Sequence, residues 1–170
     1  KFKTGTNQQI SPFGFSRILI PAGVTVKATG TPEETVIVGR KATDVLSGGG
    51  CGADSARCAF LGSGARLIGF TLTGGYSTTI TSSAAAAAGA SDGGAAYSVS
   101  SAYGSLVDCI ITNNVASNTG GSGYGLHYFG CYISGNTAVQ TYGQGARYGY
   151  LFNCRLKETS KIGGAVSVCY

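Results

Sequence analysis

Apolar residues recur at every second position in short runs along this chain, for example in residues 131–133 and 165–169. Runs with a period of two predict β-strands, and the Gly, Asn, Ser and Thr residues between them predict turns. No segment keeps apolar residues at a spacing of three to four over ten or more positions, as an amphipathic helix would. The pattern therefore predicts an all-β chain.

The strand-like runs repeat along the sequence. Equivalent runs begin at four positions separated by 39, 22 and 23 residues, which are Phe70, Cys109, Cys131 and Cys154. The longest step contains an insertion that includes an alanine run at residues 84–88. A repeat of about 22 residues built only of short strands and turns is typical of a parallel β-solenoid, whose coils stack about 4.8 Å apart.

Stacked coils place equivalent residues in ladders. We expect the four residues that mark the repeat to point inward as a core ladder. Asn114 and Asn136 each stand five residues beyond one of them, and we expect these two to form a turn ladder whose side-chain amides hydrogen-bond from coil to coil.

The repeat predicts one domain with a defined layout. Residues 18–170 should form a single-domain right-handed parallel β-helix with coils of about 22 residues, because parallel crossover connections are almost always right-handed. Loop insertions are expected near residues 44–57 and 77–92. Residues 1–17 show no period, and we interpret them as an N-terminal cap or assembly segment.

Composition narrows the function classes. The chain has 170 residues with 43% hydrophobic and 11% charged residues, which suits one folded domain. Its net charge of +5 is scattered and forms no basic cluster, so we expect no nucleic-acid partner. No window approaches the roughly 20 apolar residues of a transmembrane helix. The chain holds no Met and starts at Lys1, which indicates processing and an extracellular or cell-surface location.

The cysteines fall into two groups. Cys51 and Cys58 bracket a short loop, and we predict a disulfide between them because the expected compartment is oxidising. The three cysteines of the core ladder stand one coil apart, a separation that would allow a bond. Three cannot all pair with one another, and we interpret them as buried thiols that act as small apolar filler. The spacings match no metal-ligand pattern, so we predict no metal.

The stretch SARCAFL at residues 55–61, the stretch GFTLTGG at residues 69–75 and the later Asn-Cys and Gly-Gly-Ala motifs resemble bacterial right-handed parallel β-helix repeat proteins. These include the polymorphic outer-membrane and adhesin-like kind, within the pectate-lyase-like solenoid superfamily. The resemblance covers roughly residues 18–170 and implies the solenoid fold. The same fold carries lyases, glycosidases, tailspikes, adhesins and inert surface proteins, so the resemblance leaves the function open.

Catalytic signatures are scarce. No position of the repeat stacks two carboxylates, a pair that glycosidases on such folds require. His127 is the one histidine, and no Gly-x-Ser-x-Gly elbow accompanies it. We therefore expect no catalytic residues, no cofactor and a non-enzymatic protein.

Tyrosines crowd into two coils of the repeat. Facing outward they would suit sugar rings or a protein partner, and facing inward they would belong to the core. Alternation places some on each face, so both interpretations stay open for the set. The candidate contact residues are Tyr124, Tyr128, Tyr132, Tyr142, Tyr148 and Tyr150.

The last predicted strand has no polar capping segment after it, and open solenoid ends recruit other chains. The expected assembly ends are Lys1, Phe2, Lys3, Phe13, Phe15, Val166, Val168, Cys169 and Tyr170. The sequence thus favours an extracellular structural or adhesive protein that assembles with itself, end to end, into a fibre or surface layer. The alternative is a β-helix that binds or cleaves polysaccharide, with surface glycans as partners.

Overall fold

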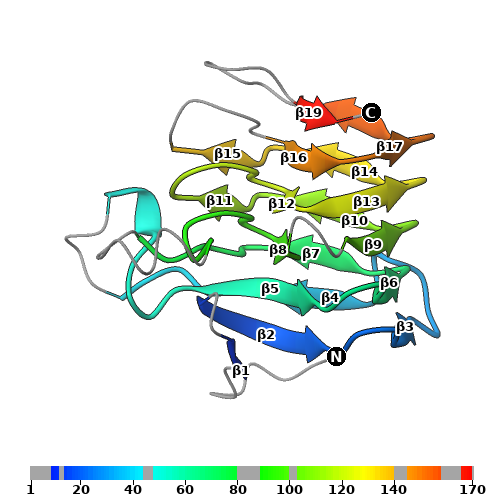
Figure 1. The fold of residues 1–170 in the computed structure, drawn as a ribbon, viewed down its shortest axis with the longest axis horizontal. Coiled ribbons are helices and arrows are strands. Elements are labelled where there is room, and N and C mark those ends of the chain that lie inside the picture. Colours follow the sequence, from blue (N-terminus) through cyan, green and yellow to red (C-terminus); the bar gives the residue numbers. More distant parts are fainter. Residues whose placement is uncertain are drawn as a thin grey trace.

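The computed structural model describes residues 9–11, 14–43, 48–79, 89–99, 103–139, 145–157 and 166–169. Strands lie in layers above one another, and the chain winds from each layer to the next (Figure 1). Helical structure in these described ranges is confined to the short 3-10 turn η1, Gly48–Gly50. The all-β prediction is therefore confirmed. No helix within the described ranges is long and apolar enough to cross a membrane.

Each coil contributes strands to three faces of the stack. The first sheet has the order β1 (Gln9–Ser11), β2 (Gly14–Ile20), β5 (Ala56–Leu61), β8 (Ala96–Tyr97), β12 (Gly123–Tyr124), β16 (Ala146–Gly149) and β19 (Val166–Cys169). The second sheet contains β3 (Thr25–Lys27), β6 (Arg66–Ile68), β9 (Gly104–Val107), β13 (Leu126–Phe129) and β17 (Leu151–Phe152). The third contains β4 (Val36–Val38), β7 (Thr71–Thr73), β10 (Ile110–Thr112), β14 (Tyr132–Ser134) and β18 (Arg155–Lys157).

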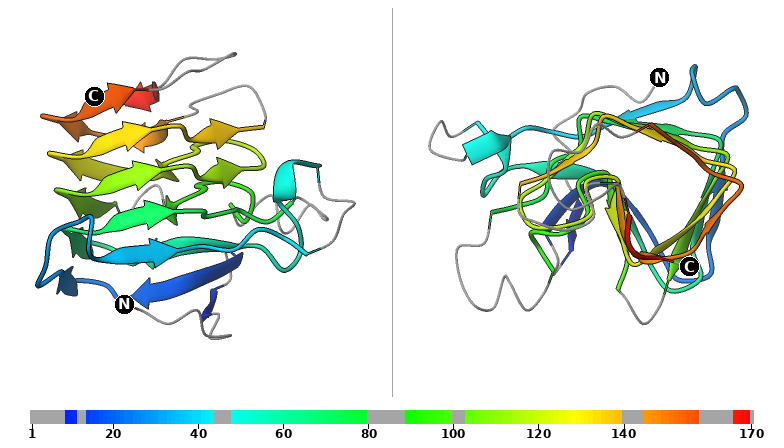
Figure 2. Two further views of the ribbon diagram at one scale, coloured as in Figure 1. Left: turned by 180° about the vertical axis from the view of Figure 1, so that it is seen from behind. Right: turned by 90° about the horizontal axis from the view of Figure 1, so that it is seen from above.

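Parallel pairing joins the coils in all three sheets. A further two-stranded parallel sheet pairs β11 (Val115–Ala116) with β15 (Thr137–Ala138). The exception is β1, which pairs antiparallel with β2 at the edge of the first sheet. Seen from above, the coils follow one another around a common interior (Figure 2). This arrangement is compatible with a parallel β-solenoid.

The register places the repeated residues above one another. Ile111 lies opposite Leu72 in one neighbouring coil and opposite Ile133 in the other. All three side chains are fully buried. Phe70, Cys109, Cys131 and Cys154 each stand directly before a strand of the third sheet. The parallel stack begins earlier than residue 18, because Phe15 in β2 already pairs with Ala56 in β5.

Some turns between strands require a left-handed backbone. Gly120 has φ +69°, and a Cβ added there would lie 2.4 Å from the carbonyl oxygen of Gly123. Gly23 has nearly the same φ, +71°, but a Cβ there would meet nothing within 4 Å. Both glycines thus adopt a left-handed backbone, but only Gly120 lacks space for a side chain.

We expect Gly23→Ala to lower the free energy of unfolding by about 1 kcal/mol, the cost of a left-handed alanine. Gly120→Ala should cost about 2 kcal/mol more, because the added methyl must displace backbone. Urea unfolding of the two variants measures the difference. Equal losses would show that the turn at Gly120 relaxes freely.

Candidate functional site

A hollow of about 190 Å³ lies against the outer side of the first sheet. It is lined by Asp92, Asn118, Thr119, Tyr124, Arg147 and Tyr148. These residues come from successive coils. Asp92 precedes β8, Asn118 and Thr119 precede β12, Tyr124 lies in β12, and Arg147 and Tyr148 lie in β16. Stacking thus brings residues more than 50 positions apart to one place.

An aromatic column ends at this hollow. Phe60, Tyr97, Tyr124 and Arg147 occupy equivalent positions in four neighbouring strands of the first sheet. The Phe60 and Tyr97 ring centroids lie 6.2 Å apart, and those of Tyr97 and Tyr124 lie 5.4 Å apart with planes 11° from parallel. Such stacked pairs add about 0.5–1.5 kcal/mol beyond the area they bury. The column therefore holds Tyr124 rigidly beside the hollow.

Tyr148 closes the column edge-on. Its ring lies 5.2 Å from that of Tyr124 at an interplanar angle of 72°, and the Arg147 guanidinium lies 4.9 Å from the Tyr148 ring centroid. Tyr148 has φ +51°, a left-handed conformation that is unfavourable for a bulky residue. Strained residues of this kind concentrate at functional sites, which marks Tyr148 as a candidate contact residue.

Asp92 supplies the carboxylate of the site. Its Oδ1 accepts hydrogen bonds from Asn118 Nδ2 at 2.8 Å and from Thr119 Oγ1 at 2.9 Å. Burial raises the pKa of Asp92, and these hydrogen bonds together with Arg57 oppose that rise. A carboxylate has about four acceptor positions, so Asp92 can accept a further hydrogen bond from a ligand.

Arg57 anchors the loop that carries Asp92. The side chain is fully buried, and its guanidinium donates hydrogen bonds to the carbonyls of Gly89, Ala90, Asp92 and Gly93 at 2.6–3.0 Å. It also lies 5.2 Å from the Tyr97 ring centroid. Burial lowers its pKa to about 10, which still leaves the group charged at neutral pH. The carbonyls take the place of water around this cation.

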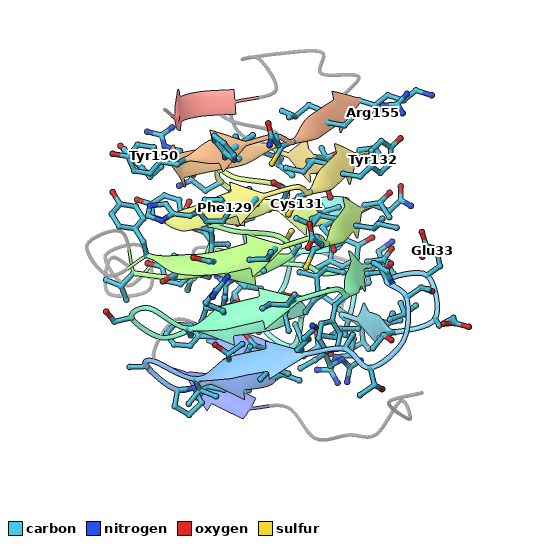
Figure 3. The ribbon with its side chains drawn as sticks, turned by 90° about the vertical axis from the view of Figure 1, so that its right-hand side faces the viewer. Glu33, Phe129, Cys131, Tyr132, Tyr150 and Arg155 are labelled. Carbon is cyan, nitrogen blue, oxygen red and sulfur yellow. The ribbon has the colours of Figure 1, made fainter. Side chains whose placement is uncertain are left out.

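The predicted tyrosines do not form one surface. Tyr124 and Tyr148 line the hollow, whereas Tyr128 is fully buried in the core. Tyr132 lies on the third sheet, where the Arg155 guanidinium is 5.9 Å from its ring. Figure 3 shows Tyr132 and Arg155 on one side and Tyr150 on the other. Tyr142 lies outside the described residues.

A second cluster of rings covers the outer side of the second sheet. His127 lies 4.6 Å from Tyr103 and 4.8 Å from Tyr150, measured between ring centroids. Phe129 and Phe152 lie 6.4 Å apart, and Tyr150, Phe129 and Phe152 are 47%, 38% and 62% exposed. Figure 3 shows Phe129 and Tyr150 at this outer side. We call these five residues the second-sheet aromatic surface.

The predicted disulfide between Cys51 and Cys58 is wrong, because both residues carry free thiols. Cys58 Sγ lies 3.3 Å from the Thr73 carbonyl oxygen, inside the core. Cys51 Sγ contacts the Val115 carbonyl oxygen at 3.7 Å instead. The two sulfurs have different neighbours, although the residues are only seven positions apart in sequence. Burial raises the pKa of Cys58 to about 12, so this thiol stays protonated.

The two expected ladders occupy the interior. Asn114 donates from Nδ2 to Asn136 Oδ1 at 2.9 Å, and its own Oδ1 accepts from Gly75 N at 2.8 Å. Both asparagines are buried. Phe70, Cys109 and Cys131 of the core ladder are also buried, and Cys154 is half-buried.

The expected assembly residues are divided between described and undescribed parts. Phe15 lies half-buried in β2. Val166, Val168 and Cys169 lie in β19, which pairs with β16. The others lie outside the described residues: Lys1, Phe2, Lys3, Phe13 and Tyr170.

No protein family, curated protein or solved structure matches this chain. In the part of the chain that the structure describes, no group of three or more His, Cys, Asp or Glu side chains is arranged to hold a metal ion. The chemistry of the site therefore has to be argued from its own residues.

Sequence reasoning missed Asp92 and Arg57 as site residues. The signal was an arginine within the apolar run 56–61 and an aspartate before two glycines.

We expect Arg57→Met to lower the free energy of unfolding by about 3–5 kcal/mol, because it removes the buried guanidinium that donates to four buried carbonyls. Arg66→Met is the matched control on an exposed position of β6, and it should cost less than about 0.5 kcal/mol. Chemical denaturation compares the two variants. A small loss in Arg57→Met would show that water replaces the guanidinium.

Proposed function

We propose that this protein is an extracellular, adhesive, right-handed β-helix that binds a saccharide in the hollow beside Asp92. The observation that carries the proposal is the meeting of one carboxylate, one guanidinium, one amide, one hydroxyl and two phenol rings in a single hollow. Binding sites combine flat apolar surface with a few well-placed polar groups, and this set supplies both.

The lining suits the two surfaces of a sugar ring. Sugar hydroxyls exchange hydrogen bonds with carboxylate, amide and hydroxyl groups such as those of Asp92, Asn118 and Thr119. The C–H face of a sugar packs against an aromatic ring, which Tyr124 and Tyr148 provide. The hollow is smaller than the roughly 300–1,000 Å³ of pockets that enclose drug-sized ligands. It would therefore accept one unit of a polysaccharide whose remaining units lie outside.

The site supports binding better than cleavage. Glycoside hydrolysis uses two carboxyl groups on either side of the scissile bond, and Asp92 is the single acidic side chain among the described residues that line the hollow. Its two hydrogen-bond donors, Asn118 and Thr119, hold the carboxylate in a fixed position. A fixed, hydrogen-bonded carboxylate is well suited to orient a sugar hydroxyl.

A second candidate function is self-association. The second-sheet aromatic surface exposes Phe129, Tyr150 and Phe152 together, and contiguous exposed apolar groups mark interaction surfaces. This surface supports the structural class of function without any role for the hollow. The two proposals therefore separate experimentally.

Tyr148→Gly tests the saccharide site. Glycine suits φ +51°, and this relief of backbone strain offsets part of the packing that is lost with the ring. Loss of the ring should weaken saccharide affinity about tenfold or more. A panel of immobilised neutral and acidic polysaccharides identifies the ligand, and calorimetry with a matching oligosaccharide measures affinity. Tyr132→Ala, on the third sheet, is the control and should bind normally.

Two results would contradict the saccharide site. One is a parent protein that binds no member of the panel. The other is an equal loss of affinity in Tyr148→Gly and Tyr132→Ala. If the parent binds nothing and its sedimentation coefficient rises with protein concentration, self-association becomes the better interpretation.

Saccharide binding should weaken at acidic pH as Asp92 gains a proton and loses an acceptor. Because burial raises the pKa of Asp92, the loss should begin at a higher pH than an exposed aspartate would give. A raised carboxyl pKa means that the folded state takes up this proton more readily than the unfolded state. Titration of Asp92 therefore does not itself unfold the protein. Calorimetric titrations across the acidic range should show the decline, and Asp92→Asn should abolish it.

A further inference from the structure

The core ladder brings three cysteines of successive coils together. Tyr132 N donates to the Cys109 carbonyl at 2.9 Å, and Arg155 N donates to the Cys131 carbonyl at 2.8 Å. These backbone bonds tie each cysteine to the next coil. Equivalent residues of neighbouring strands stand about 4.8 Å apart, within the roughly 4.4–6.8 Å between Cα atoms that a disulfide spans.

The three sulfurs form a row. Each Sγ lies 3.2–3.5 Å from the carbonyl oxygen two residues earlier, at Val107, Phe129 and Phe152. The identical contact means that the side chains have the same orientation in all three coils. Cys131 stands directly before β14, which pairs with β10 on one side and with β18 on the other. Cys131 therefore lies in the middle of the row.

Access to the row comes from one end. Cys109 and Cys131 are each 1% exposed, whereas Cys154 is half-buried. The hydrogen bond from the Cys131 thiol lowers the pKa of Cys154. Hydrogen bonding to the side chains of Cys109 and Cys154, together with burial, raises the pKa of Cys131. The accessible sulfur is thus also the one with more thiolate character, which is the nucleophilic form.

We propose that Cys154 is the attacking thiol of a thiol–disulfide exchange site and that Cys131 is its resolving partner. The co-reactant is a small organic disulfide, RSSR. The Cys154 thiolate attacks one sulfur of RSSR, the S–S bond breaks, and one RS⁻ leaves and takes up a proton. A mixed disulfide remains on Cys154.

Cys131 then completes the exchange. Its sulfur attacks Cys154 Sγ, the bond to the remaining RS group breaks, and the departing RS group takes up the Cys131 thiol proton. The products are a Cys131–Cys154 disulfide and a second RSH. The two protein thiols lose two electrons in total, and RSSR gains them. The new bond clamps the coil of β14 to the coil of β18.

The test uses 5,5′-dithiobis(2-nitrobenzoate) as RSSR on the folded chain without denaturant. Peptide mapping of the reacted parent protein should recover Cys131 cross-linked to Cys154, with no aryl adduct on either residue. Cys131→Ser should instead retain one aryl group on Cys154. Cys109→Ser, the matched control from the same ladder, should give the parent's cross-link at a rate within about twofold.

The parent protein alone can overturn the proposal, so a variant that fails to fold does not decide it. A stable aryl adduct on Cys154 of the folded parent would remove Cys131 from the exchange. A cross-link between Cys109 and Cys131 would assign the pair wrongly, and no reaction at Cys154 would show that the sulfur is inaccessible. None of these outcomes bears on saccharide binding, which depends on another face of the stack.

Discussion

Parallel backbone hydrogen bonds join each pair of neighbouring coils in the three sheets that the structure describes. A group that loses its neighbour in such a stack leaves a donor or acceptor unpaired in the interior. The structure meets this demand even in its turns, where Asn114 Nδ2 donates to Asn136 Oδ1 in one neighbouring coil and Asn114 Oδ1 accepts from Gly75 N in the other. In-register stacking is therefore the constraint that fixes which residues can stand at each position. It also explains why buried residue types recur from coil to coil, as the asparagines and the cysteines do.

The insertion before β8 departs from this rule, and Arg57 compensates for the departure. Residues 89–93 lie directly before β8 and belong to no strand. The buried guanidinium bonds to four of these residues. A neutral side chain could not supply as many donors in one plane. The same contacts fix the position of Asp92 above the first sheet. The hollow thus depends on a buried cation, because Arg57 both stabilises the fold and positions Asp92.

Part of this arrangement could be predicted from the sequence. The strands of the third sheet were predictable because apolar residues such as Leu72, Ile111 and Ile133 recur at one register. The directions of the tyrosines were not. Tyr124 and Tyr128 stand four residues apart and would share a face in one continuous strand. Gly125, at φ +66°, turns the chain between them, so Tyr124 faces outward and Tyr128 lies in the core. The Cys51–Cys58 prediction failed for a related reason, since closeness in sequence does not decide where a sulfur points.

The position of the hollow follows from where the aromatic column stops. Phe60, Tyr97 and Tyr124 stack because neighbouring coils bring equivalent side chains to a separation that suits parallel rings. At the next coil the equivalent residue is Arg147, which adds a charge where a ring would have continued the column. Tyr148 then enters edge-on from the adjacent position, at the cost of a left-handed backbone. Arg147 and Tyr148 therefore line the hollow at the place where the stack of parallel rings ends.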